Sequence, residues 1–237
     1  MKAVILAGGK GTRLAPYTKI LPKPLMPIGD MPVLEVLIRQ IKREGVDEVI
    51  LTVGHLAELL QAFFNNGKSL GVEITYSIED EPLGTAGPLS LVRDRLTETF
   101  LVMNGDVLTT LKVGDLVRFH KEQGGIATIA MHRRHVKVDL GVIQLNGGQI
   151  VQDYIEKHTY DFSVSMGIYV FEPRVLDYIP HGEYLDFPNL VHRLLDAGEK
   201  VVGYQFEGYW QDLGRPDDYE QAAQDFEKMR SEFLPED

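Results

Sequence analysis

The sequence of 237 residues contains no cysteine, so it can form neither a disulfide nor a thiolate metal site, which fits a cytoplasmic protein. It also lacks any apolar run that approaches the roughly 20 residues needed to span a membrane. The apolar stretch Val4–Ala7 is too short for the core of a signal peptide, so we expect none. These absences, together with 44% hydrophobic residues, predict a globular protein with an ample core.

Acidic residues are absent from the first 29 positions, although the whole chain carries a net charge of −11. The overall charge argues against general binding to nucleic acid or to acidic membranes. Five basic residues precede the first carboxylate, at Lys2, Lys10, Arg13, Lys19 and Lys23. We expect an acidic protein to reserve such a segment for an anion, and the neighbouring glycines indicate phosphate.

Short β-branched runs alternate with amphipathic stretches in the first half of the chain. We expect strands at 2–6, 48–53, 72–78 and 100–103, and helices at 32–44, 56–65 and 84–94. This alternation predicts the α/β class, with a doubly wound, Rossmann-like, mostly parallel sheet flanked by helices. Ligands of such sheets bind beyond the carboxyl ends of the strands.

Beyond about residue 125 the pattern contains more strands. We expect them at 126–132, 141–145, 150–155, 165–171 and 201–206, with helices at 173–178, 187–198 and 216–229. Asn146-Gly147-Gly148 predicts a hairpin turn. Since no linker is visible, we treat 1–237 as a single domain with two functional halves, 1–125 and 126–237.

Both common nucleotide-binding motifs fail at the N-terminal glycines. Gly9–Leu14 lacks the third glycine of a dinucleotide fingerprint, and no acidic residue stands near 26–28 to hold a ribose. A P-loop is excluded because Lys10 lies between the glycines. The glycines could also form an ordinary strand-to-helix turn, but the adjoining Thr12-Arg13 favours phosphate binding.

The segment Leu6–Thr18 (LAGGKGTRLAPYT), followed by Leu21–Leu25 (LPKPL), resembles the signature of the sugar-1-phosphate nucleotidylyltransferases. Further matches follow in order at Glu81–Leu89, Val102–Asp106, Leu140–Val142, Ile155–Lys157, Ser165–Tyr169 and Gly208–Gly214. The resemblance covers nearly the whole chain and approaches the catalytic domain of mannose-1-phosphate guanylyltransferases.

Three departures from that family are visible. His158 stands where the family usually has proline, and Ser165-Met166 stands where it usually has asparagine or threonine. The chain also ends without the left-handed β-helix domain of those relatives. We therefore expect that any homo-oligomer would assemble through this domain.

The resemblance implies the nucleotide-diphospho-sugar transferase fold with a small sugar-binding subregion. It also implies attack by a sugar-1-phosphate on the α-phosphorus of an NTP, with Mg²⁺ as cofactor and pyrophosphate leaving. A phosphate is already a nucleophile, so positioning and electrostatics can do most of the work. The implied catalytic residues are Arg13 and Lys23, whereas Lys10 is either a phosphate ligand or a solvated loop lysine. The implied nucleotide site comprises Leu6, Ala7, Gly8, Gly9, Gly11, Thr12, Arg13, Glu79, Gly84, Thr85 and Asn104.

By the same resemblance, Asp106 and Asp212 hold Mg²⁺, which prefers hard oxygen ligands. Either aspartate alone would read as a turn residue. On the sugar side, Glu156 accepts hydrogen bonds from hydroxyls and Lys157 pairs with the phosphate, although an exposed ion pair is the plainer interpretation. Gly141 would permit close approach of the sugar, and Ser165 offers a hydroxyl.

Base choice follows from the pair Glu79 and Gly84, because thymidylyl relatives read the base with a glutamine and a glycine at this spacing. A carboxylate accepts from both N1–H and N2–H₂ of guanine, which favours GTP and leaves UTP and dTTP open. The acidic run that begins at Glu79 could instead be solvated surface. His132 and His135 are expected in a solvated turn rather than a metal site.

Two other functions stay open from the sequence. One is a non-catalytic sensor of nucleotide-sugars with the same fold, and the other is a transferase for a non-sugar phosphate such as phosphocholine. We expect no nucleic acid or membrane partner, and the sequence does not identify the sugar.

Overall fold

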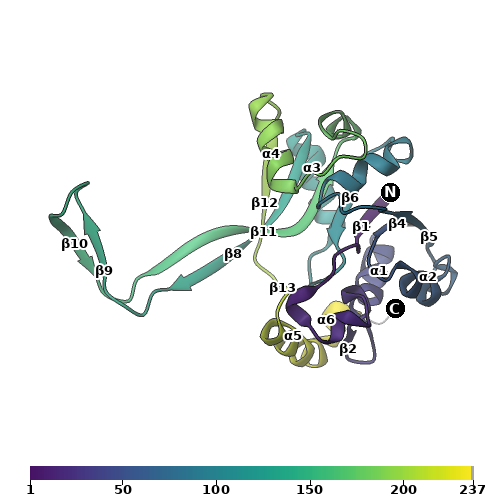
Figure 1. Ribbon diagram of the computed structural model, residues 1–237, viewed down its shortest axis with the longest axis horizontal. Helices are drawn as coiled ribbons and strands as arrows, with labels where there is room; N and C mark the ends of the chain where they lie inside the picture. The colour runs from purple at the N-terminus through teal and green to yellow at the C-terminus, as the bar shows by residue number, and fades with distance from the viewer. Residues whose placement is uncertain (236–237) are drawn as a thin grey trace.

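The computed structural model describes residues 1–235 and is built around a seven-stranded sheet (Figure 1). The strand order is β12-β8-β11-β6-β1-β4-β5. The bounds are β1 (Lys2–Leu6), β4 (Glu48–Val53), β5 (Glu73–Ile78), β6 (Phe100–Asn104), β8 (Ala127–Lys137), β11 (Thr159–Phe171) and β12 (Val201–Phe206). Within this sheet only β11 runs antiparallel to its neighbours, so the predicted mostly parallel sheet is confirmed.

Helical segments cover both faces of the sheet because its strands are apolar on both sides. In β1, Ala3 and Ile5 pack into one core cluster and Val4 packs into the other, as strand alternation requires. The first cluster includes residues of α1 (Val33–Arg43), α2 (Ala57–Phe64) and α3 (Val113–Gln123). The second includes residues of η5 (Gly87–Arg95), η6 (Pro173–Tyr178) and α4 (Phe187–Asp196).

The helices expected at 84–94 and 173–178 are 3₁₀ segments, η5 and η6, rather than α-helices. In η5 the Ser90 hydroxyl donates to the Gly87 carbonyl at 2.7 Å, and Val92 departs from helical geometry. Such local side-chain bonds compete with the regular helical pattern. No helix within residues 1–235 is long and apolar enough to cross a membrane.

A third cluster lies at the C-terminal end of the chain and positions one edge of the cleft. It joins α5 (Pro216–Lys228) and α6 (Arg230–Phe233) to two small sheets. These sheets are formed by β2 (Pro27–Ile28) with β3 (Met31–Pro32), and by β7 (Val107–Thr109) with β13 (Trp210–Asp212). Because Asp212 pairs with Val107, the chain brings Asp212 beside Asp106.

Strands β8 and β11 continue past the sheet as a two-stranded ribbon that projects from the body (Figure 1). The ribbon ends in a hairpin of β9 (Val142–Leu145) and β10 (Val151–Ile155), and we call residues 133–164 the arm. The predicted turn after β9 is confirmed, with Gly147 at φ 87°. The sequence ended the first ribbon strand at 132 and began the second at 165, so it missed this projection.

Candidate active site

A cleft of about 890 Å³ lies at the carboxyl ends of the parallel strands β1, β4 and β6, where a doubly wound sheet places its ligands. All but one of the residues predicted for nucleotide binding line it. They are Leu6, Ala7, Gly8, Gly9, Gly11, Arg13, Glu79, Gly84, Thr85 and Asn104. The exception is Thr12, which opens the 3₁₀ turn η1 (Thr12–Leu14) beneath the loop.

The glycine loop makes close contacts at two of its glycines, Gly8 and Gly11. Gly11 adopts φ 59°, and its carbonyl accepts the Thr18 hydroxyl at 2.8 Å. A Cβ at Gly11 would lie 2.9 Å from the Thr18 methyl, and a Cβ at Gly8 would lie 2.7 Å from Glu79 Oε1. The glycines therefore let the loop sit close to both Thr18 and Glu79.

Lys23 lies between the two aspartates that the sequence singled out. Its ammonium forms an ion pair with Asp106 and lies 3.8 Å from Asp212 Oδ1. Lys23 opens the 3₁₀ turn η3 (Lys23–Leu25) between two prolines, and its side chain is only 11% exposed. The prolines limit where the lysine can point. The structure thus brings Lys23, Asp106 and Asp212 together at one end of the cleft.

Asp106 and Asp212 repel each other electrostatically, although Lys23 lies between them. Burial raises the pKa of the Asp212 carboxyl, and the negative charge of Asp106 raises that pKa further. Lys23 and Arg13 act in the opposite direction by favouring the charged form. The two carboxylates therefore offer oxygen ligands to a cation, and they would be stabilised by more positive charge than Lys23 and Arg13 supply.

This donor set suits Mg²⁺. Residues 1–235 contain no converging group of three or more His, Cys, Asp or Glu side chains that could enclose a metal. Two carboxylates are nevertheless a usual protein contribution to Mg²⁺, which keeps several waters and takes oxygens from substrate phosphates. Asp106 and Asp212 are thus the residues that would hold the ion.

Glu79 lies beside the glycine loop, next to Gly8. Its Oε2 accepts the Leu83 amide at 3.0 Å, and burial raises the pKa of its carboxyl, while that hydrogen bond opposes the rise. Gly84 adopts φ 77° with the Leu185 carbonyl packed against it, and the Thr85 amide donates to Asp186 at 3.0 Å. These contacts fix the segment that the sequence linked to base choice.

Three polar side chains of the cleft escaped the sequence interpretation. Thr52 is 1% exposed, and its hydroxyl has no hydrogen-bond partner within the described chain. His55 Nε2 lies 3.4 Å from the Thr18 carbonyl, and the Tyr184 hydroxyl donates to Asp186 at 2.6 Å. All three line the cleft. A signal existed only for Thr52, which is the one polar residue in the apolar run from Val49 to Val53.

The predicted sugar-side residues are divided between two places. Ser165 lies at the root of the arm, where its hydroxyl is 3.0 Å from that of Tyr169. Gly141, Glu156 and Lys157 belong to the arm and do not line the cleft. A Cβ at Gly141 would overlap the Tyr154 hydroxyl, so the space beside this glycine is filled by the arm itself.

His132 and His135 do not form the expected turn but belong to strand β8. His132 Nε2 lies 3.1 Å from the Gly208 carbonyl, whereas His135 pairs with Asp161. Residues three apart on a strand face opposite sides, so the two imidazoles do not converge.

Residues 2–229 match the family described as Nucleotidyl transferase. The UTP--glucose-1-phosphate uridylyltransferase of Synechocystis is 36% identical over 241 residues, covering 94% of this chain and 62% of that protein. The mannose-1-phosphate guanyltransferase of Schizosaccharomyces pombe is 37% identical over 231 residues, covering 92% of this chain and 62% of that protein. The chain therefore spans about 62% of the length of these curated relatives.

Among solved structures, a putative glucose-1-phosphate thymidylyltransferase from Bacillus anthracis superposes with a TM-score of 0.75. The match covers 94% of each chain at 24% sequence identity, and at that identity it shows the fold alone.

Proposed function

Because this chain belongs to the nucleotidyl transferase family, whose curated relatives here act on sugar-1-phosphates, we propose that it transfers a nucleotidyl group from an NTP to a sugar-1-phosphate. The observation that carries the proposal is the convergence of the glycine loop, Arg13, Lys23, Asp106 and Asp212 at one cleft. The backbone amides of a glycine loop and a lysine can bind phosphate groups, and the paired carboxylates can hold a divalent cation.

In the proposed reaction, an oxygen of the sugar phosphate attacks the α-phosphorus and the bond to pyrophosphate breaks. Backbone amides of Gly8–Gly11 bind the triphosphate, and the Arg13 guanidinium donates paired hydrogen bonds to its outer phosphate oxygens. Lys23 neutralises the reacting phosphates once the substrates compete for it with Asp106 and Asp212. The protein therefore acts by positioning and charge, with no covalent intermediate on the chain.

The implied Mg²⁺ would supply charge neutralisation between the triphosphate and the attacking phosphate. On the protein side, Asp106, in the turn between β6 and β7, and Asp212, in β13, would hold it. Burial first, and then the negative charge of Asp106, raise the pKa of the Asp212 carboxyl, and both effects support a cation at this position.

GTP is the proposed nucleotide. Glu79 lines the cleft and is held by the Leu83 amide through Oε2, which leaves Oε1 beside the glycine loop to accept from guanine. Guanine presents two donors on one edge, whereas uracil and thymine present one. The curated relatives include both a uridylyl and a guanylyl enzyme, so this choice rests on Glu79.

The test is a coupled assay of pyrophosphate release with five NTPs against several sugar-1-phosphates, with and without Mg²⁺. We expect the highest rate with GTP and Mg²⁺. Asp106→Asn and Asp212→Asn should each lower the rate about 100-fold or more, because each removes a ligand of the charge-neutralising ion. Asp115→Asn on α3, where the carboxylate pairs with Arg118, is the control and should stay active.

Near-normal turnover in both cleft variants would contradict the metal assignment. NTP binding by the wild-type protein without any pyrophosphate release would instead indicate a non-catalytic sensor.

A further inference from the structure

The cleft contains one aromatic side chain that the proposed reaction does not use. Among the described residues that line the cleft, Tyr184 is the only phenylalanine, tyrosine or tryptophan. Its ring is not packed in the core, because the residue is 62% exposed. Tyr184 shares the cleft with Glu79 and Gly84, the two residues linked to base choice. An exposed aromatic ring beside a proposed base site is a candidate contact for the base itself.

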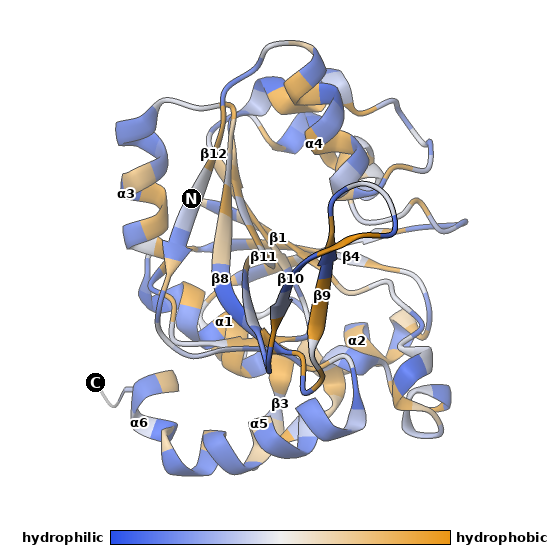
Figure 2. Cartoon of the chain, turned by 90° about the vertical axis from the view of Figure 1, so that its left-hand side faces the viewer, coloured by the Kyte–Doolittle hydropathy of each residue, from blue (hydrophilic) through white to orange (hydrophobic). Residues whose placement is uncertain are grey.

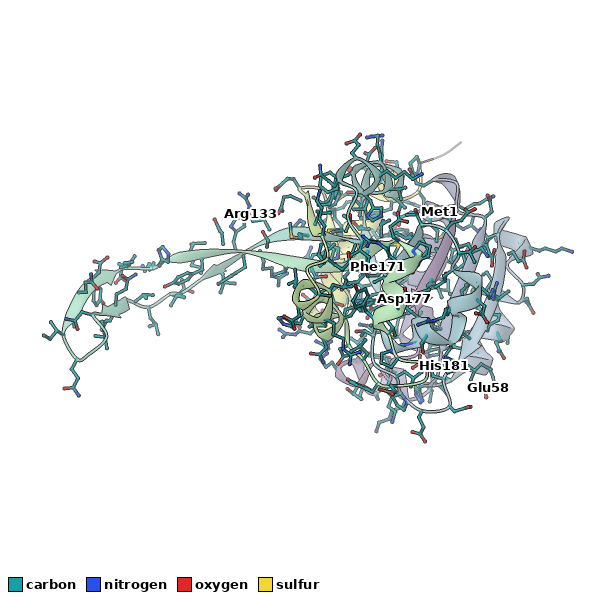
Figure 3. All side chains as sticks on the ribbon, turned by 90° about the horizontal axis from the view of Figure 1, so that it is seen from above. Met1, Glu58, Arg133, Phe171, Asp177 and His181 are labelled. Atoms are coloured by element: carbon teal, nitrogen blue, oxygen red, sulfur yellow. The ribbon has the colours of Figure 1, made fainter. Side chains whose placement is uncertain are left out.

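The segment that carries Tyr184 is anchored to the body at both ends. At its start, His181, which Figure 3 labels, has Nδ1 3.2 Å from the Ser90 carbonyl. At its end, helix α4 begins at Phe187, and Figure 2 shows both hydrophobic and hydrophilic colour on this helix. The apolar side chains of α4, Phe187 among them, are buried in the second core cluster. The segment is therefore held between two fixed points.

Backbone contacts join the residue after Tyr184 to the segment linked to base choice. The Leu185 amide donates to the Leu83 carbonyl at 2.9 Å. A Cβ at Gly84 would lie 2.7 Å from the Leu185 carbonyl oxygen, so the two segments touch directly. The Leu83 amide in turn donates to Glu79. The backbone at Tyr184 therefore stays in register with the residues proposed to select the base.

The Asp186 carboxylate fixes the tyrosine side chain. Its Oδ2 accepts the Tyr184 hydroxyl at 2.6 Å, and its Oδ1 accepts the amide and the hydroxyl of Thr85 at 3.0 Å and 3.3 Å. An aspartate directly before a helix usually accepts amides of the first helical turn. Within the described chain Asp186 makes no such bond to α4, and the Thr85 hydroxyl accepts the Phe187 amide at 2.8 Å instead. Both oxygens of Asp186 are thus used to hold Tyr184 and Thr85.

This hydrogen bond prepares the ring of Tyr184 for a flat ligand. The bond to Asp186 raises the pKa of the Tyr184 phenol, so the hydroxyl stays protonated and remains the donor at neutral pH. A side chain that is held before its ligand arrives loses less conformational freedom on binding. Every nucleobase has a π-face that can stack on an aromatic side chain. Tyr184 therefore offers a preorganised surface for a base.

We propose that Tyr184 contacts the face of the nucleobase and that Asp186, as a positioning residue, holds the tyrosine ring in place. Glu79 then selects the base by its edge, and the ring binds the base by its face. A purine presents a larger face than a pyrimidine, so the contact also favours GTP over UTP. The inference rests on the proposed function for the identity of the ligand as an NTP, but it concerns binding and can be tested without turnover.

The first test compares ligands with and without a base. Isothermal titration calorimetry in the presence of Mg²⁺ measures the binding of GTP, UTP and inorganic tripolyphosphate to the wild type and to Tyr184→Ala. We expect Tyr184→Ala to weaken GTP binding about tenfold and UTP binding about threefold, and to leave tripolyphosphate binding unchanged because that ligand has no base. Phe63→Ala is the control, since Phe63 is 50% exposed on α2 and does not line the cleft.

The second test separates the hydroxyl of Tyr184 from its ring. Tyr184→Phe keeps the ring but removes the bond to Asp186, so it should weaken GTP binding only about threefold. In an Asp186→Ala background the same change should have no further effect, because the carboxylate that holds the hydroxyl is already absent. Equal effects of Tyr184→Phe in the two backgrounds would exclude Asp186 as the residue that positions the ring.

Unchanged GTP binding by Tyr184→Ala would overturn the proposal, and so would an equal loss of tripolyphosphate binding. A raised KM for the sugar-1-phosphate with unchanged NTP binding would assign the ring to the sugar and would also overturn it.

Failure of this contact and failure of the proposed function give different results. Weaker GTP binding by Tyr184→Ala, in a protein whose wild type releases no pyrophosphate, would support the contact and count against nucleotidyl transfer. Pyrophosphate release by the wild type, with equal GTP binding by wild type and Tyr184→Ala, would reject the contact and leave the proposed function standing.

Discussion

Thr52 shows how a single buried hydroxyl can mark a binding site. A buried polar group without a partner costs stability, and this one lies in the wall of the cleft. Thr52→Val keeps the β-branched shape that suits strand β4. We expect the free energy of unfolding of the ligand-free protein to rise by about 1 kcal/mol and the KM for the NTP to increase.

Chemical denaturation and initial-rate kinetics measure these two effects. The matched control is Thr128→Val, which removes a hydroxyl that is bonded to His120 Nδ1 at 2.7 Å. That change should destabilise the protein. A loss of stability in Thr52→Val, or an unchanged KM, would show that the Thr52 hydroxyl is not reserved for a ligand.

Glu79 predicts a specific dependence of stability on pH. Burial raises the pKa of this carboxyl in the folded protein above its ordinary value of 4.5, so the folded state binds a proton more readily than the unfolded state. The contribution of Glu79 to stability is thus most favourable below 4.5 and declines as the pH rises through the folded pKa. Glu79→Gln removes that decline.

The melting temperature of Glu79→Gln, relative to that of the wild type, should therefore increase as the pH rises from about 4 to about 7. The exposed neighbour variant Asp80→Asn is the control. In the pyrophosphate assay, the same Glu79→Gln change should weaken GTP use more than UTP use. A constant difference in melting temperature would contradict the buried carboxylate, and an unchanged base preference would remove Glu79 from base selection.

At the scale of elements, the turn after β1 contains two glycines, Gly8 and Gly9, with different surroundings. A Cβ at Gly8 would lie 2.7 Å from Glu79 Oε1, whereas a Cβ at Gly9 would meet nothing within 4 Å. Gly8→Ala should displace the Glu79 side chain and raise the KM for the preferred NTP by about tenfold, a cost of ~1.4 kcal/mol. Gly9→Ala should change it little, and equal effects of the two variants would exclude this contact as the cause.

Most elements of the body could be predicted because their own residues decide them. Strands β1, β4 and β12 have the predicted bounds, since each is a short β-branched or apolar run with a clear end. The 3₁₀ form of η5 was not predictable from periodicity, because the Ser90 hydroxyl and the geometry of Val92 decide it. In the cleft, the convergence of Asp106 and Asp212 followed from a family resemblance, and their shared Lys23 became visible only in three dimensions.

At the scale of the whole molecule, the arm is what the sequence could not show. The sequence predicts a strand at 141–145, but a local pattern cannot say which surface covers the apolar side of that strand. In the structure that side is exposed at Ile143 and Leu145. None of the four predicted sugar-side residues lines the cleft, and their role stays a prediction.

Strand β11 belongs both to the arm and to the central sheet, and this has a mechanical consequence. It runs from Thr159 at the base of the hairpin to Phe171 beside β6, with a register shift between Ser165 and Tyr169. Gly167 lies within that shift, with the Asn104 side chain packed where its Cβ would be. The arm is therefore mechanically connected, through β11, to the wall of the cleft. A pull on the hairpin would pass through the short turn at residues 156–158 and then along β11 to Gly167, against which the Asn104 side chain packs.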